Sequence, residues 1–190
     1  GEVMNISVCN WKYAKRWVYS ITYDEALAEL HEYAIPIHEE LEIPGHVEAV
    51  ARLEPVPQFL VLSGSLPPGV PDDFYAQIAQ MAKQRDIRVI LDTSGSALRA
   101  ALDTGVFAVK PNRREFQRLG VPHDADCDTY FDAMEKLIEQ GAAQVVIVTL
   151  GPDGALLVSQ EGERFHLWPP PTEDVSPVGA GDSFIALFVH

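Results

Sequence analysis

The amino-acid sequence predicts an α/β fold: a doubly wound, mainly parallel sheet with helices on both faces. From Gln58 onward, short apolar runs rich in β-branched residues alternate with longer amphipathic stretches, and turns rich in Gly, Pro and Ser separate them. The runs at 59–64, 87–93 and 144–150 are nearly continuous in apolar residues, which is typical of parallel strands covered on both faces. The chain has 190 residues, of which 47% are hydrophobic, so it is long enough to bury a core.

Residues 1–50 predict a strand–helix unit ahead of the alternating pattern. VYSITY predicts a strand, and the residues after it predict an amphipathic helix that ends at a turn at Pro44-Gly45. This unit contains four aromatic residues, Trp11, Tyr13, Trp17 and Tyr19. They suit either a core or a sheet edge that is buried against a second subunit, so a homodimer is one possible arrangement.

From residue 59 onward we expect six strands, at 59–64, 87–93, 107–111, 144–150, 155–160 and 164–168. Helices are expected at 71–85, 96–103, 113–119 and 128–140, and from 181 onward. Ligands of such sheets bind outside the carboxyl ends of the strands. The segments that follow the strands are therefore where we expect the functional site.

Composition argues against several classes of partner. The formal net charge of −14 argues against nucleic acid, because phosphate binding needs a basic face. No apolar run approaches 18 residues, and the opening GEVMNIS lacks the layout of a signal peptide, so no membrane partner is expected. Cys9 and Cys127 fit neither a disulfide framework nor a metal-ligand spacing, which predicts a reducing compartment, the cytoplasm.

Four turn-like segments follow four of the expected strands: SGSLPPG, DTSG, KPNRRE and TLGPDG. Each of them alone reads as an ordinary turn, because Gly, Pro, Asn, Asp and Ser favour turns for local reasons. Together they would gather at one edge of one sheet. The sequence contains neither the GxxxxGK[ST] of a P-loop nor a GxGxxG after a strand.

The segment VGAGDSF, at 178–184, predicts an anion site at the start of a helix. Gly179, Ala180 and Gly181 would let the backbone approach a ligand, with unpaired N–H groups facing an anion. Asp182 beside that anion would suit a proton acceptor. The alternative is that Asp182 only caps the helix.

In this order and spacing, SGSLPPG, ILDTSG, VKPNRREF, VTLGPDGALLV and WPPP followed by SPVGAGDSF closely resemble the PfkB (ribokinase-like) sugar kinases. The branch that they resemble contains the phosphofructokinases and tagatose-6-phosphate kinases, over residues 53–190. The resemblance implies transfer of the γ-phosphoryl group of ATP, with Mg²⁺, to a sugar-phosphate hydroxyl. It gives Asp182 the role of general base, and Gly179, Ala180 and Gly181 that of the anion hole.

The resemblance also assigns ligands to the other strand ends. Asn112 and Glu115 match the N-x-x-E element that helps to hold Mg²⁺, and the same spacing is also a helix-capping pattern. Lys110 would lie near the nucleotide, or else be a simple strand-end lysine. The nucleotide loop would contain Thr149, Gly151 and Gly154.

On the sugar side, Ser63 and Gly64 match the segment beside the sugar phosphate. Asp92 would support the site, or else cap the end of its strand. Relatives often carry Ser-Thr or Asp-Thr ahead of the GAGD motif, whereas this chain has Ser176-Pro177, which we expect to tune the loop without loss of chemistry.

Family members also have a sugar-binding half with a Gly-Gly-rich segment and an early Asp, and helices that close the adenine pocket. We expect this sequence to hold the nucleotide-side core, at 51–190, without most of the sugar site. One alternative is a catalytically inactive module that binds a nucleotide or a partner. Another is a metal-dependent deacetylase, because Thr22 to Glu25 weakly resemble the T-F-D-D of NodB-type polysaccharide deacetylases. That family needs an H-x-x-x-H pair, which is missing; His31 and His38 are seven residues apart.

Overall fold

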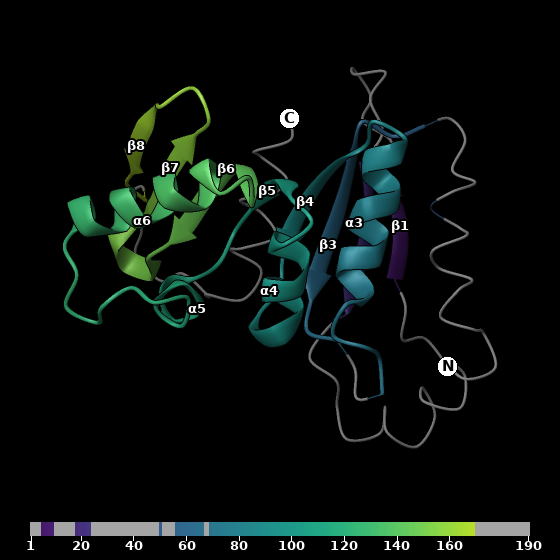
Figure 1. The fold of residues 1–190 in the computed structure, drawn as a ribbon, viewed down its shortest axis with the longest axis horizontal. Helices are drawn as coiled ribbons and strands as arrows, with labels where there is room; N and C mark the ends of the chain where they lie inside the picture. The colour runs from purple at the N-terminus through teal and green to yellow at the C-terminus, as the bar shows by residue number, and fades with distance from the viewer. Residues whose placement is uncertain (1–4, 10–17, 24–49, 51–55, 67–68, 170–190) are drawn as a thin grey trace.

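The structure is a computed structural model that describes residues 5–9, 18–23, 50, 56–66 and 69–169 (Figure 1). Its strands are β1 (Asn5–Cys9), β2 (Val18–Tyr23), β3 (Phe59–Gly64), β4 (Arg88–Asp92), β5 (Val106–Val109), β6 (Ala143–Thr149), β7 (Ala155–Ser159) and β8 (Arg164–Leu167). Its helices are α3 (Phe74–Gln84), α4 (Gly95–Leu102), α5 (Arg113–Gln117) and α6 (Cys127–Glu139), with a short 3₁₀ turn, η1 (Gly151–Asp153).

All eight described strands form one sheet, in the order in which they occur in the chain. The neighbours from β2 to β6 are parallel. Antiparallel pairs flank this parallel centre, β1 with β2 on one side and β6 with β7 and β7 with β8 on the other. The expectation of a mainly parallel α/β sheet is therefore confirmed, and the carboxyl ends of β3 to β6 lie along one edge.

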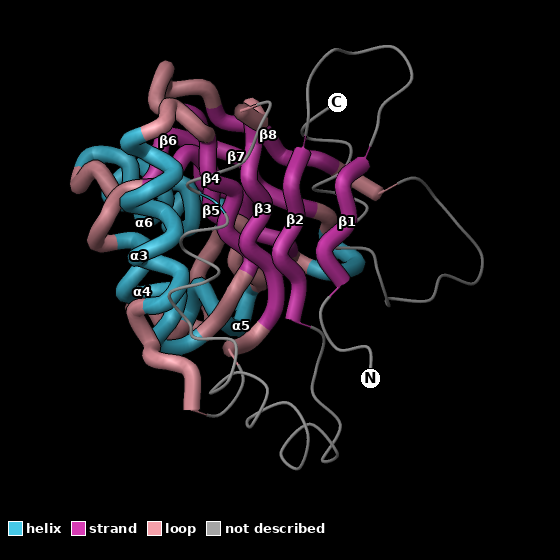
Figure 2. Tube along the Cα trace, turned by 90° about the vertical axis from the view of Figure 1, so that its right-hand side faces the viewer, coloured by secondary structure: helices cyan, strands magenta, loops and turns pink. Residues whose placement is uncertain are grey.

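The helices α3, α4 and α6 lie together on one side of the strands, and α5 lies at one end of them (Figure 2). The described helices therefore cover one face of the sheet, whereas the sequence led us to expect helices on both. Each crossover adds the next strand on the same side of the previous one, so right-handed connections place their helices on the same face. Alternate strand residues face this layer: Leu60 and Leu62 share the main core with Ile78, Leu98 and Met134. Phe59 and Val61 point to the opposite face, in a smaller cluster with Ile90 and Ala108. The helix expected from 181 lies outside the described residues.

Polar contacts fix the start of α6 and its place on the sheet. The carboxylate of Asp126 accepts hydrogen bonds from the hydroxyl of Thr129, at 2.6 Å, and from its backbone N–H, at 2.9 Å, which lowers the pKa of Asp126. Arg164 of β8 donates to Glu135, at 2.7 Å, and to Asp132, at 3.0 Å. These bonds connect α6 to the edge of the sheet.

The predicted strands and helices between 59 and 168 are all present, with ends within three residues of those expected. The strand expected at VYSITY is β2, whereas β1 was not predicted. Both pair within the same sheet as β3. The division of the chain at residue 50 stays a prediction, and the helix expected after VYSITY lies outside the described residues.

Candidate functional site

Four of the predicted polar segments meet at the carboxyl edge of the parallel strands. Ser63 at the end of β3 is the register partner of Asp92 at the end of β4. Beyond β5, Asn112 forms a parallel bridge with Thr149 at the end of β6. The sequence therefore correctly predicted which segments come together.

The centre of this edge is a buried ion pair. The Nζ atom of Lys110 lies 3.0 Å from Oδ2 of Asp92, and the two side chains are 6% and 19% exposed. A lysine this deeply buried needs its carboxylate partner, because an unpaired charge would be strongly disfavoured there. Asp92 thus holds Lys110 in place, and its support of a binding site stays a prediction. Direct contact of Lys110 with a nucleotide stays a prediction.

Asn112 and Glu115 form a complete capping box at the start of α5. Oδ1 of Asn112 accepts a hydrogen bond from the N–H of Glu115 at 3.0 Å, and Oε2 of Glu115 accepts one from the N–H of Asn112 at 2.8 Å. The capping interpretation of KPNRRE is therefore correct. It leaves the metal interpretation open, because Asn112 is exposed and each carboxylate or amide oxygen has a further lone pair.

The charge around Glu115 suits a cation. Burial raises the pKa of Glu115, and the negative charge of Asp92 raises it further. The hydrogen bond from Asn112 and the charges of Lys110 and Arg118 oppose this shift. Two carboxylates thus share this edge with Lys110, and a divalent cation would favour the ionised form of both. Mg²⁺ needs few protein oxygens because it keeps several waters, so Asn112 and Glu115 fit it.

Among the residues that the structure describes, no group of three or more His, Cys, Asp and Glu side chains could hold a metal ion by itself. Asp24 and Glu25 of the segment that suggested a deacetylase lie outside the described residues, as do His31 and His38.

The segment TLGPDG makes the tight turn between β6 and β7. The N–H of Leu150 donates to the carbonyl of Gly154 at 2.7 Å, which closes the turn around η1. Gly154 has a φ of +87°, and a Cβ atom there would lie 1.9 Å from the carbonyl oxygen of Leu167. Only glycine fits this position, so the shape of the predicted nucleotide loop is fixed by the backbone of β8.

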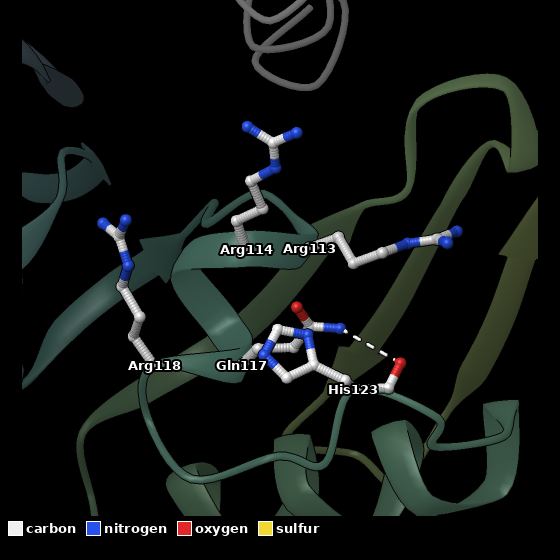
Figure 3. Close-up of a pocket in the computed structure, with 5 residues that line it drawn as sticks. All are labelled: Arg113, Arg114, Gln117, Arg118 and His123. Carbon is white, nitrogen blue, oxygen red and sulfur yellow. Dashed lines mark hydrogen bonds between the residues drawn. The ribbon is translucent and has the colours of Figure 1, made fainter.

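Sequence reasoning missed the side chain that fastens this loop to α5. Nη2 of Arg113 donates to the carbonyl of Leu150 at 3.2 Å and to the carboxylate of Asp153. Figure 3 shows Arg113 extending from α5 toward this turn. The partners are 37 and 40 residues away in sequence, and no motif pairs them.

On the sugar-side end of the edge, hydrogen bonds fix the backbone of Ser63 and Gly64. Gly64 has a φ of +92°, and its carbonyl accepts a hydrogen bond from the Thr93 hydroxyl at 2.7 Å. The hydroxyl of Tyr75 lies 3.0 Å from the carbonyl oxygen of Ser63 and 3.2 Å from that of Gly64. Ser63 is itself buried. Binding of a sugar phosphate there stays a prediction.

The remaining predicted catalytic residues, Gly179, Ala180, Gly181 and Asp182, lie outside the described residues. So do Trp11, Tyr13 and Trp17 of the proposed subunit contact. Within the part that the structure describes, no helix is long and apolar enough to span a membrane.

Comparison with known proteins decides the family. The family model described as "pfkB family carbohydrate kinase" matches residues 38–190. The chain belongs to the pfkB family of carbohydrate kinases. The resemblance inferred from the five motifs is thereby confirmed.

Curated relatives of this pfkB chain are phosphofructokinases. The chain is 42% identical over 127 residues to "ATP-dependent 6-phosphofructokinase isozyme 2" of Escherichia coli (strain K12), covering 66% of this chain and 41% of that protein. It is 40% identical over 130 residues to "1-phosphofructokinase" of Bacillus subtilis (strain 168), covering 68% and 42%. The chain thus spans about two fifths of the length of these relatives.

Solved structures confirm the fold. The crystal structure of phosphofructokinase-2 from Escherichia coli in complex with substrates and products matches with a TM-score of 0.71 and 38% identity, over 79% of this chain and 48% of that one. Arabidopsis thaliana ribokinase, complexed with ribose and ATP, matches with a TM-score of 0.60 and 27% identity, over 76% and 44%. The fold is therefore of the ribokinase type.

Proposed function

We propose that this pfkB chain takes part in ATP-dependent transfer of a phosphoryl group to a hydroxyl of a sugar phosphate. The observation that carries the proposal is the arrangement at the carboxyl edge: the Asp92–Lys110 pair, the Asn112–Glu115 box and the TLGPDG turn lie on neighbouring strands. Phosphoryl transfer is catalysed mainly by positioning and by stabilising spread negative charge, which these elements would provide.

Within this proposal, the turn from Thr149 to Gly154 lines the nucleotide, and Asn112 and Glu115 hold Mg²⁺ through water. When bound, Mg²⁺ would neutralise charge on the ATP phosphates. Lys110, held by Asp92, adds a fixed positive charge at the same edge.

The acceptor side rests on the motif residues. Asp182 would take the proton of the attacking hydroxyl, and the backbone of Gly179, Ala180 and Gly181 would face the phosphoryl oxygens. Ser63 and Gly64 would lie beside the sugar phosphate. The names of the relatives suggest a phosphorylated fructose as the acceptor, and the two cysteines are consistent with the cytoplasm.

The test is release of ADP from ATP and Mg²⁺, with and without fructose 6-phosphate or fructose 1-phosphate. The proposal predicts sugar-stimulated ADP release and its loss, by roughly 10²-fold or more, in Asp182→Asn. Asp103→Asn, a change of the same charge at the end of α4, is the matched control and should keep the rate.

A rate that Asp182→Asn retains would reject the general-base role. Nucleotide binding without any sugar-stimulated ADP release would instead favour the inactive, nucleotide-binding module.

A further inference from the structure

A hollow beside α5 presents a cluster of basic side chains. It is lined by Arg113, Arg114, Gln117, Arg118 and His123, and we call it the α5 hollow (Figure 3). Its volume of about 710 Å³ lies within the range of small-molecule pockets. Among the described residues that line it there are three guanidinium groups and no carboxylate.

Two of these guanidinium groups have no ion-pair partner among the described residues. Arg113 is held by Asp153, whereas Arg114 and Arg118 form no salt bridge with any residue that the structure describes. The nearby carboxylate of Glu115 turns back to cap its own helix. Both arginines are exposed, so their charges are available to a ligand.

The spacing of Arg114 and Arg118 brings them to one side of the helix. Side chains four residues apart are neighbours on a helical surface. Figure 3 shows Arg114 and Arg118 both extending upward from α5, while Gln117 and His123 lie below the helix in this view. Nε2 of Gln117 lies 3.4 Å from the carbonyl oxygen of His123 and 3.1 Å from the hydroxyl of Tyr130, which fixes this part of the hollow.

The cluster is unusual for this chain. The sequence has 14 Lys and Arg against 28 Asp and Glu, yet four of those basic residues fall between 110 and 118. Like charges at this spacing repel one another, and a bound anion would offset that repulsion. Guanidinium groups favour phosphate in particular, because their planar N–H donors match its oxygens in pairs.

We propose that the α5 hollow binds a small molecule that carries two or more phosphate groups, through Arg114 and Arg118. The contacts proposed here come from Arg114 and Arg118 of α5 and its end, and not from the residues predicted to hold the transferred phosphoryl group. The proposal therefore stands whether or not the chain transfers phosphate.

The probe is inorganic pyrophosphate, titrated into the full chain at fixed ionic strength while the backbone amide signals are followed by NMR. We expect saturable shifts at residues 114, 118 and 123. In Arg114→Gln/Arg118→Gln the affinity should fall about tenfold or more, because two charge-assisted contacts are lost. The single variant Arg118→Gln should fall between the two.

The control is Lys83→Gln/Lys136→Gln, with one change in α3 and one in α6. It removes two positive charges, so it changes the net charge of −14 by the same amount as the double arginine variant. It should bind pyrophosphate as the unmodified chain does. Equal weakening in both double variants, or amide shifts confined to residues 151–154 of the nucleotide loop, would overturn the proposal. If ADP shifts the same three amides at a lower concentration than pyrophosphate does, the hollow binds the phosphates of a nucleotide. If ADP and pyrophosphate bind with equal affinity, the hollow recognises the phosphate groups alone.

Discussion

The buried pair of Asp92 and Lys110 should determine a measurable part of the stability of this chain. In Asp92→Asn, Lys110 keeps its charge at 6% exposure but loses the opposite charge 3.0 Å away. Removing one partner of a buried pair costs about 3–5 kcal/mol. Because Asp92 is 19% exposed and asparagine still offers an oxygen, we expect about 2–3 kcal/mol here.

The companion variants separate pairing from packing. Lys110→Met removes the buried charge and keeps the volume, so we expect a loss of only about 1 kcal/mol. The double variant should lose about the same as Lys110→Met, which gives a coupling energy of about 2–3 kcal/mol. Urea unfolding measures all four proteins. Additive losses, or an Asp92→Asn variant within about 0.5 kcal/mol of the unmodified chain, would refute the reasoning.

The pKa of Glu115 provides a second measurement. The charge of Asp92 raises this pKa, and the charge of Lys110 lowers it. Asp92→Asn should therefore lower the pKa of Glu115, and Lys110→Met should raise it. Carboxyl NMR titration measures both. Shifts in the same direction would contradict the arrangement of the three charges.

Three further predictions follow from single contacts. Gly154→Ala should destabilise the chain by about 2–3 kcal/mol in thermal unfolding, because a Cβ there meets a carbonyl of β8, whereas Gly162→Ala, at a similar φ of +82° with nothing within 4 Å, should lose only about 1 kcal/mol. Arg113→Gln should change stability by less than about 1 kcal/mol, because its ion pair is exposed, yet weaken ADP binding measured by calorimetry; unchanged affinity would reject its loop-anchoring role. Burial raises the pKa of Glu115 above 4.5, so its contribution to stability is full below that pH and is lost as pH rises through the raised pKa; Glu115→Gln should flatten this part of the pH–stability curve measured by urea unfolding.

The sequence predicted the long apolar runs and missed one short alternating strand. The run at 59–64 opens with four apolar residues in succession, and β3 is buried along nearly its whole length. NISVC alternates polar and apolar residues as a half-buried strand does, but it is only five residues long, and no strand was predicted there. At α5 the predicted end at 119 is two residues late, because Arg118 already caps the helix ahead of Gly120, whose φ is +113°.

The candidate site shows the same limit. Motifs identified which strand ends carry polar residues, because those residue types and their order are written in the sequence. They could not show that Lys110 is buried against Asp92, or that Arg113 reaches Asp153, since such pairs depend on strand register and on the path of a turn. The local capping box, by contrast, joins two residues only three positions apart and was predictable.

The strand order has a consequence for how the chain folds. Because each strand pairs with the one next to it in sequence, no sheet contact waits for a distant segment, and the sheet can grow from one side to the other. The entropic cost of closing a loop rises only slowly with loop length, so it is greatest for the longest connections. Those connections run from Tyr23 to Phe59 and from Val109 to Ala143. We therefore expect the β3–β4–β5 unit and the β6–β7–β8 meander to form first and their docking through β5 and β6 to follow.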